Sequence, residues 1–268
     1  MSTKLISEIG WNHMGDMVLA KEMILASKEN GADMVKFQTW SVERLKDGPW
    51  DEDGRREIYE KAELTHDKHL ELIEYSNQLD IPFFTSVFSI EDAILLSSFK
   101  IDKVKIASFD STNIELLEVC DGLFKTIYIS TGTKTVDEIE KSISHIKNSD
   151  VVLLHCVSSY PLEPHNANLP RINSLKMMGD GRVGYSDHTS GVEVSKVALE
   201  YDIEVIEKHF TIDHDLPGRD NKFAILPHEL KELSDYIKLR EEVNKSHGNG
   251  YLECEKESRE IMTGRFNG

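Results

Sequence analysis

Short apolar runs alternate with amphipathic stretches along most of the 268-residue chain. The runs have the length and composition of buried parallel strands, which are apolar throughout because both of their faces are covered. We predict strands near residues 5–10, 34–39, 82–86, 104–108, 126–130, 151–156, 182–186 and 205–210. We predict helices near residues 18–30, 68–79, 91–98, 114–120, 136–146, 169–177, 192–201 and 227–244.

Eight strand-helix units in even succession, with no linker between them, are typical of a (β/α)₈ TIM barrel, an α/β fold of one domain. A doubly wound open sheet is the alternative, but no GxGxxG follows the first predicted strand. We therefore predict a barrel domain over residues 1–245 and a C-terminal tail over residues 246–268.

The composition, 39% hydrophobic and 29% charged, is that of an ordinary globular protein. The net charge of −17 argues against a nucleic acid or an anionic membrane as partner. No apolar run approaches the roughly 18 residues of a membrane span, and the N-terminus does not resemble a signal peptide. The three cysteines form no CxxC pair, so we expect a reducing, cytoplasmic location.

Two histidines, His188 and His209, stand where predicted strands give way to loops, in segments 184–191 (GYSDHTSG) and 207–211 (EKHFT). Two distant histidines have no intrinsic meaning, and a core residue plus a loop residue is the ordinary interpretation. Polar neighbours in both segments, at positions where a buried strand carries aliphatic residues, favour a shared site instead.

In a TIM barrel the carboxyl ends of all strands surround one pocket. Polar residues stand at nearly every predicted strand end, which favours a common site there. They are Glu8, Lys36, Gln38, Thr85, Ser86, Lys105, Ser108, Ser130, Thr131, His155, Ser158, Ser186, His188, Lys208 and His209.

Lys36 and Lys105 supply two cations, and residues 130–132 (STG) are expected to open a helix whose first amides bind an anion. Hydroxyl donors come from Ser86, Ser108, Ser130 and Ser186. We predict a cradle for a phosphate, a carboxylate or both.

His188 and His209, with Glu8 as a direct or water-bridged third ligand, can hold a divalent ion with open positions. An open position indicates a Lewis acid rather than a structural metal. Mn²⁺, Mg²⁺, Co²⁺ and Zn²⁺ all suit such a ligand set.

Eight segments, in the same order and across about residues 5–230, resemble the sialic acid synthase family. They are residues 7–16 (SEIGWNHMGD), 31–38 (GADMVKFQ), 105–108 (KIAS), 130–132 (STG), 154–161 (LHCVSSYP), 166–169 (NANL), 184–191 and 207–211.

The resemblance implies a metal-dependent condensation of phosphoenolpyruvate with N-acetylmannosamine or a related amino sugar. The product would be a 3-deoxy-2-ulosonic acid, formed with phosphate release. By matching motif, phosphoenolpyruvate would be held by Lys36, Ser86, Lys105, Ser108, Ser130 and Ser186. The metal, usually Mn²⁺ or Mg²⁺, would lie on His188 and His209 near Glu8, a plausible proton carrier. The sugar would contact Gln38, Asp110, Ser158, Tyr160 and Asp220.

The sequence departs from the family pattern at two positions near the sugar. Asp110 replaces a frequent Glu, and Ser158 replaces a frequent Asn. Family proteins also continue into a small antifreeze-like domain that reaches a partner's active site. This sequence stops at Gly268 after an acidic segment at 253–260, so we expect a barrel without that domain. The resemblance implies a homodimer and leaves the acceptor sugar open.

Two other functions remain open: a metal-dependent sugar aldolase or isomerase that uses the same histidines, and a non-catalytic ligand-binding barrel that needs a partner for activity. The anion cradle distinguishes the synthase from the first of these. Cys156 and His155 should face opposite sides of their strand, so we expect a buried thiol rather than a nucleophile. His13, Trp11 and Trp50 are expected at the pocket rim.

Overall fold

The structure, a computed structural model, describes residues 3–266. The chain divides into two compact units, Met1–Ile237 and Lys238–Gly268. The first unit contains the whole barrel. The predicted domain boundary at residue 245 lies within the second unit and stays a prediction.

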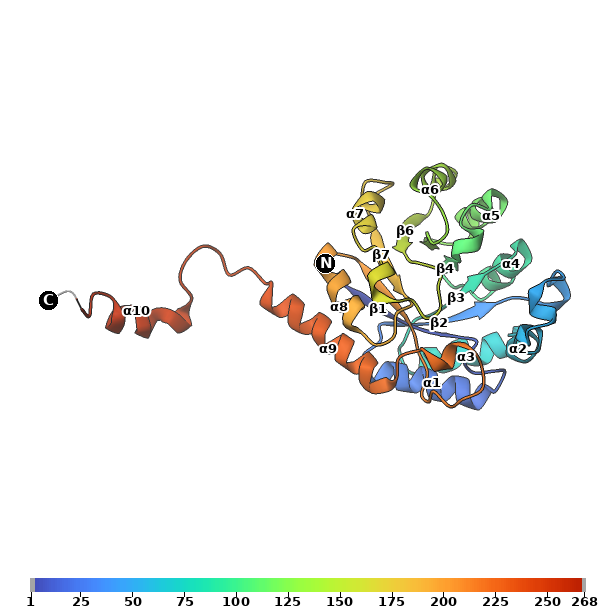
Figure 1. Cartoon of the computed structure of the whole chain (residues 1–268), viewed down its shortest axis with the longest axis horizontal. Helices are drawn as coiled ribbons and strands as arrows, with labels where there is room; N and C mark the ends of the chain where they lie inside the picture. Colours follow the sequence, from blue (N-terminus) through green and yellow to red (C-terminus); the bar gives the residue numbers. More distant parts are fainter. Residues whose placement is uncertain (1–2, 267–268) are drawn as a thin grey trace. The chain divides into compact units, whose positions relative to one another are not determined.

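Eight parallel strands form a closed barrel in the order of the sequence, with β1 paired to β8 (Figure 1). They are β1 (Lys4–Gly10), β2 (Met34–Thr39), β3 (Phe83–Val87), β4 (Lys103–Ile106), β5 (Thr126–Ser130), β6 (Asp150–His155), β7 (Val183–Asp187) and β8 (Val205–His209). Closure of the sheet confirms the predicted TIM barrel and excludes the open, doubly wound sheet.

Helices connect successive strands on the outside of the barrel (Figure 1). They are α1 (Met17–Glu29), α2 (Arg55–Ala62), α3 (His66–Gln78), α4 (Ile90–Ser98), α5 (Ile114–Leu123), α6 (Val136–Ile143), α7 (Arg171–Lys176) and α8 (Glu193–Ala198). A further helix, α9 (Pro227–Val243), begins in the first unit. Helix α2 was not predicted, because its eight residues bury only Ile58 and Ala62 and show little apolar periodicity.

The barrel interior has its own small core. It consists of inward residues from six strands: Ile6, Met34, Phe84, Tyr128, Val152, Leu154 and Val205. A Cβ on Gly184 of β7 would come within 2.4 Å of Val205 Cγ1, so only glycine fits where these strands approach. This packed interior leaves the carboxyl ends of the strands as the open end of the barrel.

The second unit contains a 3₁₀ turn at Glu253–Glu255 and helix α10 (Lys256–Met262). Every residue from 246 to 266 is exposed. Within residues 3–266, no helix combines the length and the apolar composition that a membrane crossing requires.

Candidate active site

A cavity of about 1030 Å³ opens at the carboxyl ends of the strands. Thirteen of the fourteen residues assigned to the site from the sequence line this cavity. They are Glu8, Lys36, Gln38, Ser86, Lys105, Ser108, Ser130, Ser158, Tyr160, Ser186, His188, His209 and Asp220. Asp110 does not line it, although its neighbours Ser108 and Phe109 do.

Four other polar strand-end residues point away from the cavity, so the expectation that they share the pocket is wrong. The hydroxyl of Thr85 bonds to that of Thr39, and Thr131 Oγ1 bonds to the carbonyl oxygen of Leu154. His155 Nε2 lies 2.8 Å from the carbonyl oxygen of Ala167, and Lys208 Nζ lies 3.0 Å from Asp187 Oδ2. Successive side chains of a strand face opposite sides, and these belong to the outer side.

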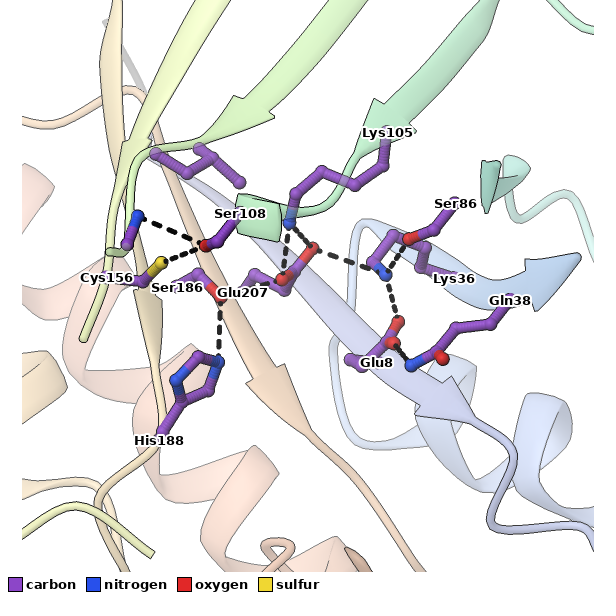
Figure 2. A network of polar contacts seen from close by, with 12 residues as sticks. Glu8, Lys36, Gln38, Ser86, Lys105, Ser108, Cys156, Ser186, His188 and Glu207 are labelled. Atoms are coloured by element: carbon purple, nitrogen blue, oxygen red, sulfur yellow. Dashed lines mark hydrogen bonds and ion pairs between the residues drawn. The ribbon is translucent and has the colours of Figure 1, made fainter. Parts of the chain in front are cut away.

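Two lysines and two glutamates form a buried cluster on the cavity floor, which we name the inner cluster: Glu8, Lys36, Lys105 and Glu207 (Figure 2). Lys36 Nζ lies 2.6 Å from Glu8 Oε2 and donates to Ser86 Oγ at 2.9 Å. Lys105 Nζ lies 2.8 and 3.0 Å from the two carboxylate oxygens of Glu207. Lys36 reaches the same carboxylate at 3.7 Å.

Glu207 was not assigned to the site from the sequence. Its carboxylate is shared by both lysines and also accepts a hydrogen bond of 2.8 Å from Ser186 Oγ. The alternation of side chains along a strand could have identified Glu207 from the sequence. His209 was assigned to the cavity, and a residue two positions earlier on the same strand faces the same side.

The two carboxyl groups of the inner cluster have opposite pKa shifts. Burial raises the pKa of Glu8 to about 7, although Lys36 acts against this. Burial also works to raise the pKa of Glu207, but Lys105 and Lys36 together hold it well below its usual range. Glu207 is therefore the more acidic of the two, whereas the raised pKa of Glu8 lies near neutrality, where a general acid or base is most effective.

The serine side of the cavity is built around Gly132. Its amide donates to Ser108 Oγ at 3.1 Å, and a Cβ there would come within 2.5 Å of Ser158 Oγ. The prediction that residues 130–132 open a helix is wrong, because α6 begins at Val136 with Thr135 as its N-cap. Cys156 is buried beside Ser108, as expected, with a distance of 3.1 Å between sulfur and oxygen.

His188 and His209 lie side by side, with ring centroids 5.6 Å apart. His188 Nδ1 lies 2.8 Å from the carbonyl oxygen of Val157, and His209 Nδ1 lies 3.5 Å from Asp220 Oδ2. Burial lowers the pKa of both rings, that of His188 to about 4, so both are neutral at pH 7. With Nδ1 of His188 protonated toward the carbonyl oxygen of Val157, its Nε2, 3.3 Å from Ser186 Oγ, keeps its lone pair, the form that binds metal ions.

These two imidazoles fit a divalent ion that takes its remaining ligands from water or substrate. Within residues 3–266, no group of three His, Cys, Asp or Glu side chains forms a metal-binding set. The Glu8 carboxylate instead contacts Lys36 and accepts a hydrogen bond of 2.8 Å from Gln38 Nε2. Its part in metal binding stays a prediction.

Tyr160 and Asp220 cover the histidine pair. The Tyr160 ring lies 4.2 Å from that of His188, centroid to centroid. Burial raises the pKa of Asp220 to about 6, against the effect of the Trp11 indole. Trp11 lines the cavity as expected, whereas His13 and Trp50 do not.

A model of the NeuB family matches residues 23–250. The chain belongs to the NeuB family. The resemblance to sialic acid synthases is thereby confirmed, and the protein is an enzyme of the sialic acid synthase type.

Two curated relatives of this NeuB protein are synthases of different acids. It is 34% identical to an N,N'-diacetyllegionaminic acid synthase of Campylobacter jejuni, over 95% of this chain and 80% of the relative. It is 32% identical to an N-acetylneuraminate-9-phosphate synthase of Drosophila melanogaster, over 88% and 67%. The solved N-acetylneuraminic acid synthetase of Leptospira borgpetersenii, in complex with citrate, has a TM-score of 0.86 and 33% identity, covering 100% of this chain and 94% of that one.

Proposed function

We propose that this NeuB protein joins phosphoenolpyruvate to the aldehyde of an amino sugar and releases phosphate. One observation carries the proposal. Two buried lysines, Lys36 and Lys105, meet at one carboxylate on the floor of a cavity whose wall holds two neutral histidines. An anion site beside a Lewis-acid site is what this reaction needs. The names of the relatives support the same reaction class.

The inner cluster and the serines around it supply the anion half of the reaction. Lys36 and Lys105 bind the phosphate and carboxylate of phosphoenolpyruvate, with hydroxyl donors from Ser86, Ser108, Ser130 and Ser186. Because Glu207 is anionic and fixed by Ser186, it holds both ammonium groups extended into the cavity. The site is thus organised before the substrate arrives.

His188 and His209 hold the metal, with Mn²⁺ or Mg²⁺ as the proposed ion and Glu8 near it. A divalent ion held by these residues would polarise the carbonyl of the acceptor. C3 of phosphoenolpyruvate forms a bond to the aldehyde carbon with the electrons of its C2=C3 double bond, and water adds at C2. The C2–O bond to phosphate then breaks; one proton of the water replaces the proton that Glu8 gives up, and the other leaves with phosphate. Glu8 donates a proton to the aldehyde oxygen, which its pKa of about 7 permits at neutral pH. Gln38, Tyr160, Ser158 and Asp220 orient the sugar.

The sequence also left open a metal-dependent aldolase or isomerase. Such an enzyme would use the histidines but would give Lys36 and Lys105 no phosphoenolpyruvate to bind, so the inner cluster favours the synthase. The unpaired cysteines support a cytoplasmic protein, and the family resemblance supports a homodimer.

Phosphate release tests the reaction. The protein is incubated with phosphoenolpyruvate, Mn²⁺ and a panel of amino sugars and simple aldoses, with and without a chelator. We expect release that depends on one class of acceptor and stops with the chelator. Release that is indifferent to the acceptor, or no release while phosphoenolpyruvate leaves the melting temperature unchanged, would contradict the proposal.

A further inference from the structure

A short turn, residues 131–134, follows strand β5 and precedes helix α6, and we name it the β5 turn. It begins directly after Ser130, which lines the cavity. Within it, Thr133 has a φ of 61°, in the left-handed region that a β-branched residue rarely adopts. Such a conformation persists only where neighbouring groups hold it, so the contacts of the turn decide its shape.

Arg171, the first residue of α7, reaches across to both ends of the β5 turn. Its Nη1 donates to the carbonyl oxygen of Thr131 at 3.0 Å, and its Nη2 donates to the carbonyl oxygen of Lys134 at 2.7 Å. Nη1 also lies 3.2 Å from Thr131 Oγ1. Because the guanidinium is planar and holds its donors in a fixed fork, it sets the distance between the two carbonyl groups.

The middle of the β5 turn packs on the serine side of the cavity. A Cβ on Gly132 would come within 2.8 Å of Ser108 Oγ and 3.0 Å of Cys156 Sγ, so the backbone of the turn lies directly against these groups. Ser108 Oγ accepts the hydrogen bond from the Gly132 amide. The hydroxyl proton of Ser108 is then available to an anion in the cavity.

Arg171 itself does not line the cavity. Its side chain is partly buried, and its guanidinium donates to the turn through both terminal nitrogens. Any contribution of Arg171 to anion binding therefore passes through the β5 turn.

We propose that Arg171 is a positioning residue for phosphoenolpyruvate. It holds the β5 turn in the conformation that places the Gly132 amide on Ser108 and leaves Ser130 at the cavity. The inference rests on the proposed binding of phosphoenolpyruvate at Ser108 and Ser130. It adds a residue outside the cavity that organises this side of the site before the substrate arrives.

A purely structural arginine is the competing interpretation, and Arg182 is an example of one. Arg182 directly precedes β7, at the amino end of the barrel. Its Nε donates to Glu204 at 2.8 Å, and its Nη1 lies 3.1 Å from Asp150 Oδ2. Arg182→Met is therefore the matched control for Arg171→Met, since it removes a guanidinium of the barrel that is remote from the cavity.

Steady-state kinetics separate the two roles. In Arg171→Met, we expect KM for phosphoenolpyruvate to rise about tenfold and KM for the acceptor to stay unchanged, because only the serine side is disturbed. Arg182→Met should lower Tm and keep both KM values. An Arg171→Met protein with a lower Tm and parental KM values, or with equal rises in both, would overturn the proposal.

Relief of the left-handed threonine provides a rescue. Glycine adopts a φ of 61° without a Cβ penalty, so Thr133→Gly in the Arg171→Met background should restore KM for phosphoenolpyruvate to within about threefold of the parent value. Arg171→Lys keeps the charge without the fork and should give an intermediate KM. The absence of any rescue, or a parental KM in Arg171→Lys, would contradict a role for the two-point contact.

Binding without turnover distinguishes this inference from the proposed function. Phosphoenolpyruvate is titrated calorimetrically, with Mn²⁺ and without acceptor, into the parent protein, Arg171→Met and Arg182→Met. We expect a Kd about tenfold higher in Arg171→Met alone. This result without phosphate release from any acceptor would refute the condensation and keep the role of Arg171. Equal affinities with normal phosphate release would refute that role alone, and no binding to the parent protein would refute both.

Discussion

The barrel sheet carries buried charges on both of its faces, and the two sets differ in a way that separates function from structure. The outer pair, Asp187 and Lys208, lies between the barrel and its helices, with 3.0 Å between Nζ and Oδ2. Asp187 also accepts hydrogen bonds from Thr189 and from Ser195 of α8. One cation thus faces one anion, and the surrounding hydrogen bonds complete the pair.

The inner cluster lies on the inner face of the barrel sheet, on β1, β2, β4 and β8, and borders the cavity (Figure 2). Its two lysines share Glu207, and burial raises the pKa of its second carboxyl, that of Glu8, to about 7. When Glu8 is protonated, two cations face one anion. Burial of charge alone therefore does not mark a functional site. An excess of buried positive charge that faces an open cavity does mark such a site.

Neutralising Lys105 should have the largest effect on turnover. Lys105→Met removes a cation that is expected to bind phosphoenolpyruvate in a desolvated site, so kcat/KM should fall by about 10³-fold. Phosphate release measures the loss, and circular dichroism checks the fold. Near-normal turnover in a folded Lys105→Met protein would remove the inner cluster from the mechanism.

His209→Ala should lower kcat/KM about as much as Lys105→Met does, because it removes one of the two proposed metal ligands. Calorimetric titration with Mn²⁺ should show binding to the parent protein and none to this variant. Asp220→Asn is the graded control. It keeps both imidazoles but weakens the contact that orients His209, so metal affinity should fall by about tenfold or more. Unchanged Mn²⁺ affinity in His209→Ala would exclude the histidine pair as the metal site.

Lys208→Met should affect stability instead of chemistry. It leaves the buried Asp187 carboxylate without its counter-ion, which costs about 3 kcal/mol and lowers Tm by about 10 °C. The double variant Asp187→Asn/Lys208→Met should regain most of this loss, since no unpaired charge remains. Thermal unfolding measures both. A selective loss of kcat at an unchanged Tm would mean that the outer pair acts on the reaction.

The strands were predictable because buried parallel strands are continuous apolar runs, and all eight predicted runs overlap the observed strands. Most of the assigned site residues that line the cavity were predicted from their position at or after the carboxyl ends of the strands. The prediction failed where it had to assign side chains to the inner or the outer face of a strand. Thr85 and Lys208 were grouped with the pocket, and Glu207 was left out, because side-chain parity was not applied along each strand.

The contact between Trp11 and Tyr59 at the cavity mouth shows a different limit. Trp11 was expected at the rim, but Tyr59 lies on α2, a short helix with too few apolar positions to be predicted. The two rings meet because the loop after β1 and the connection after β2 bring them together. Loop geometry of this kind leaves no periodic signal in a sequence.

Glu207→Gln provides the finest comparison of the two faces, because it removes one charge from the inner cluster and keeps its shape. The negative charge of Glu207 contributes to the raised pKa of Glu8. Without it, burial still raises the pKa of Glu8 and Lys36 still lowers it, so this pKa should fall below about 7. If protonated Glu8 is the acid, kcat/KM of the parent enzyme should decline as the pH rises through about 7.

In Glu207→Gln this decline should begin at a pH lower by about one unit, which pH-rate profiles measure. Glu8→Gln should lose the decline altogether, and Lys208→Met should keep the parental profile because its charge lies on the outer face. A profile that is the same in Glu207→Gln as in the parent would mean that the two carboxyl groups are not coupled. The inner cluster would then resemble the outer pair, a set of closed contacts with no proton to exchange.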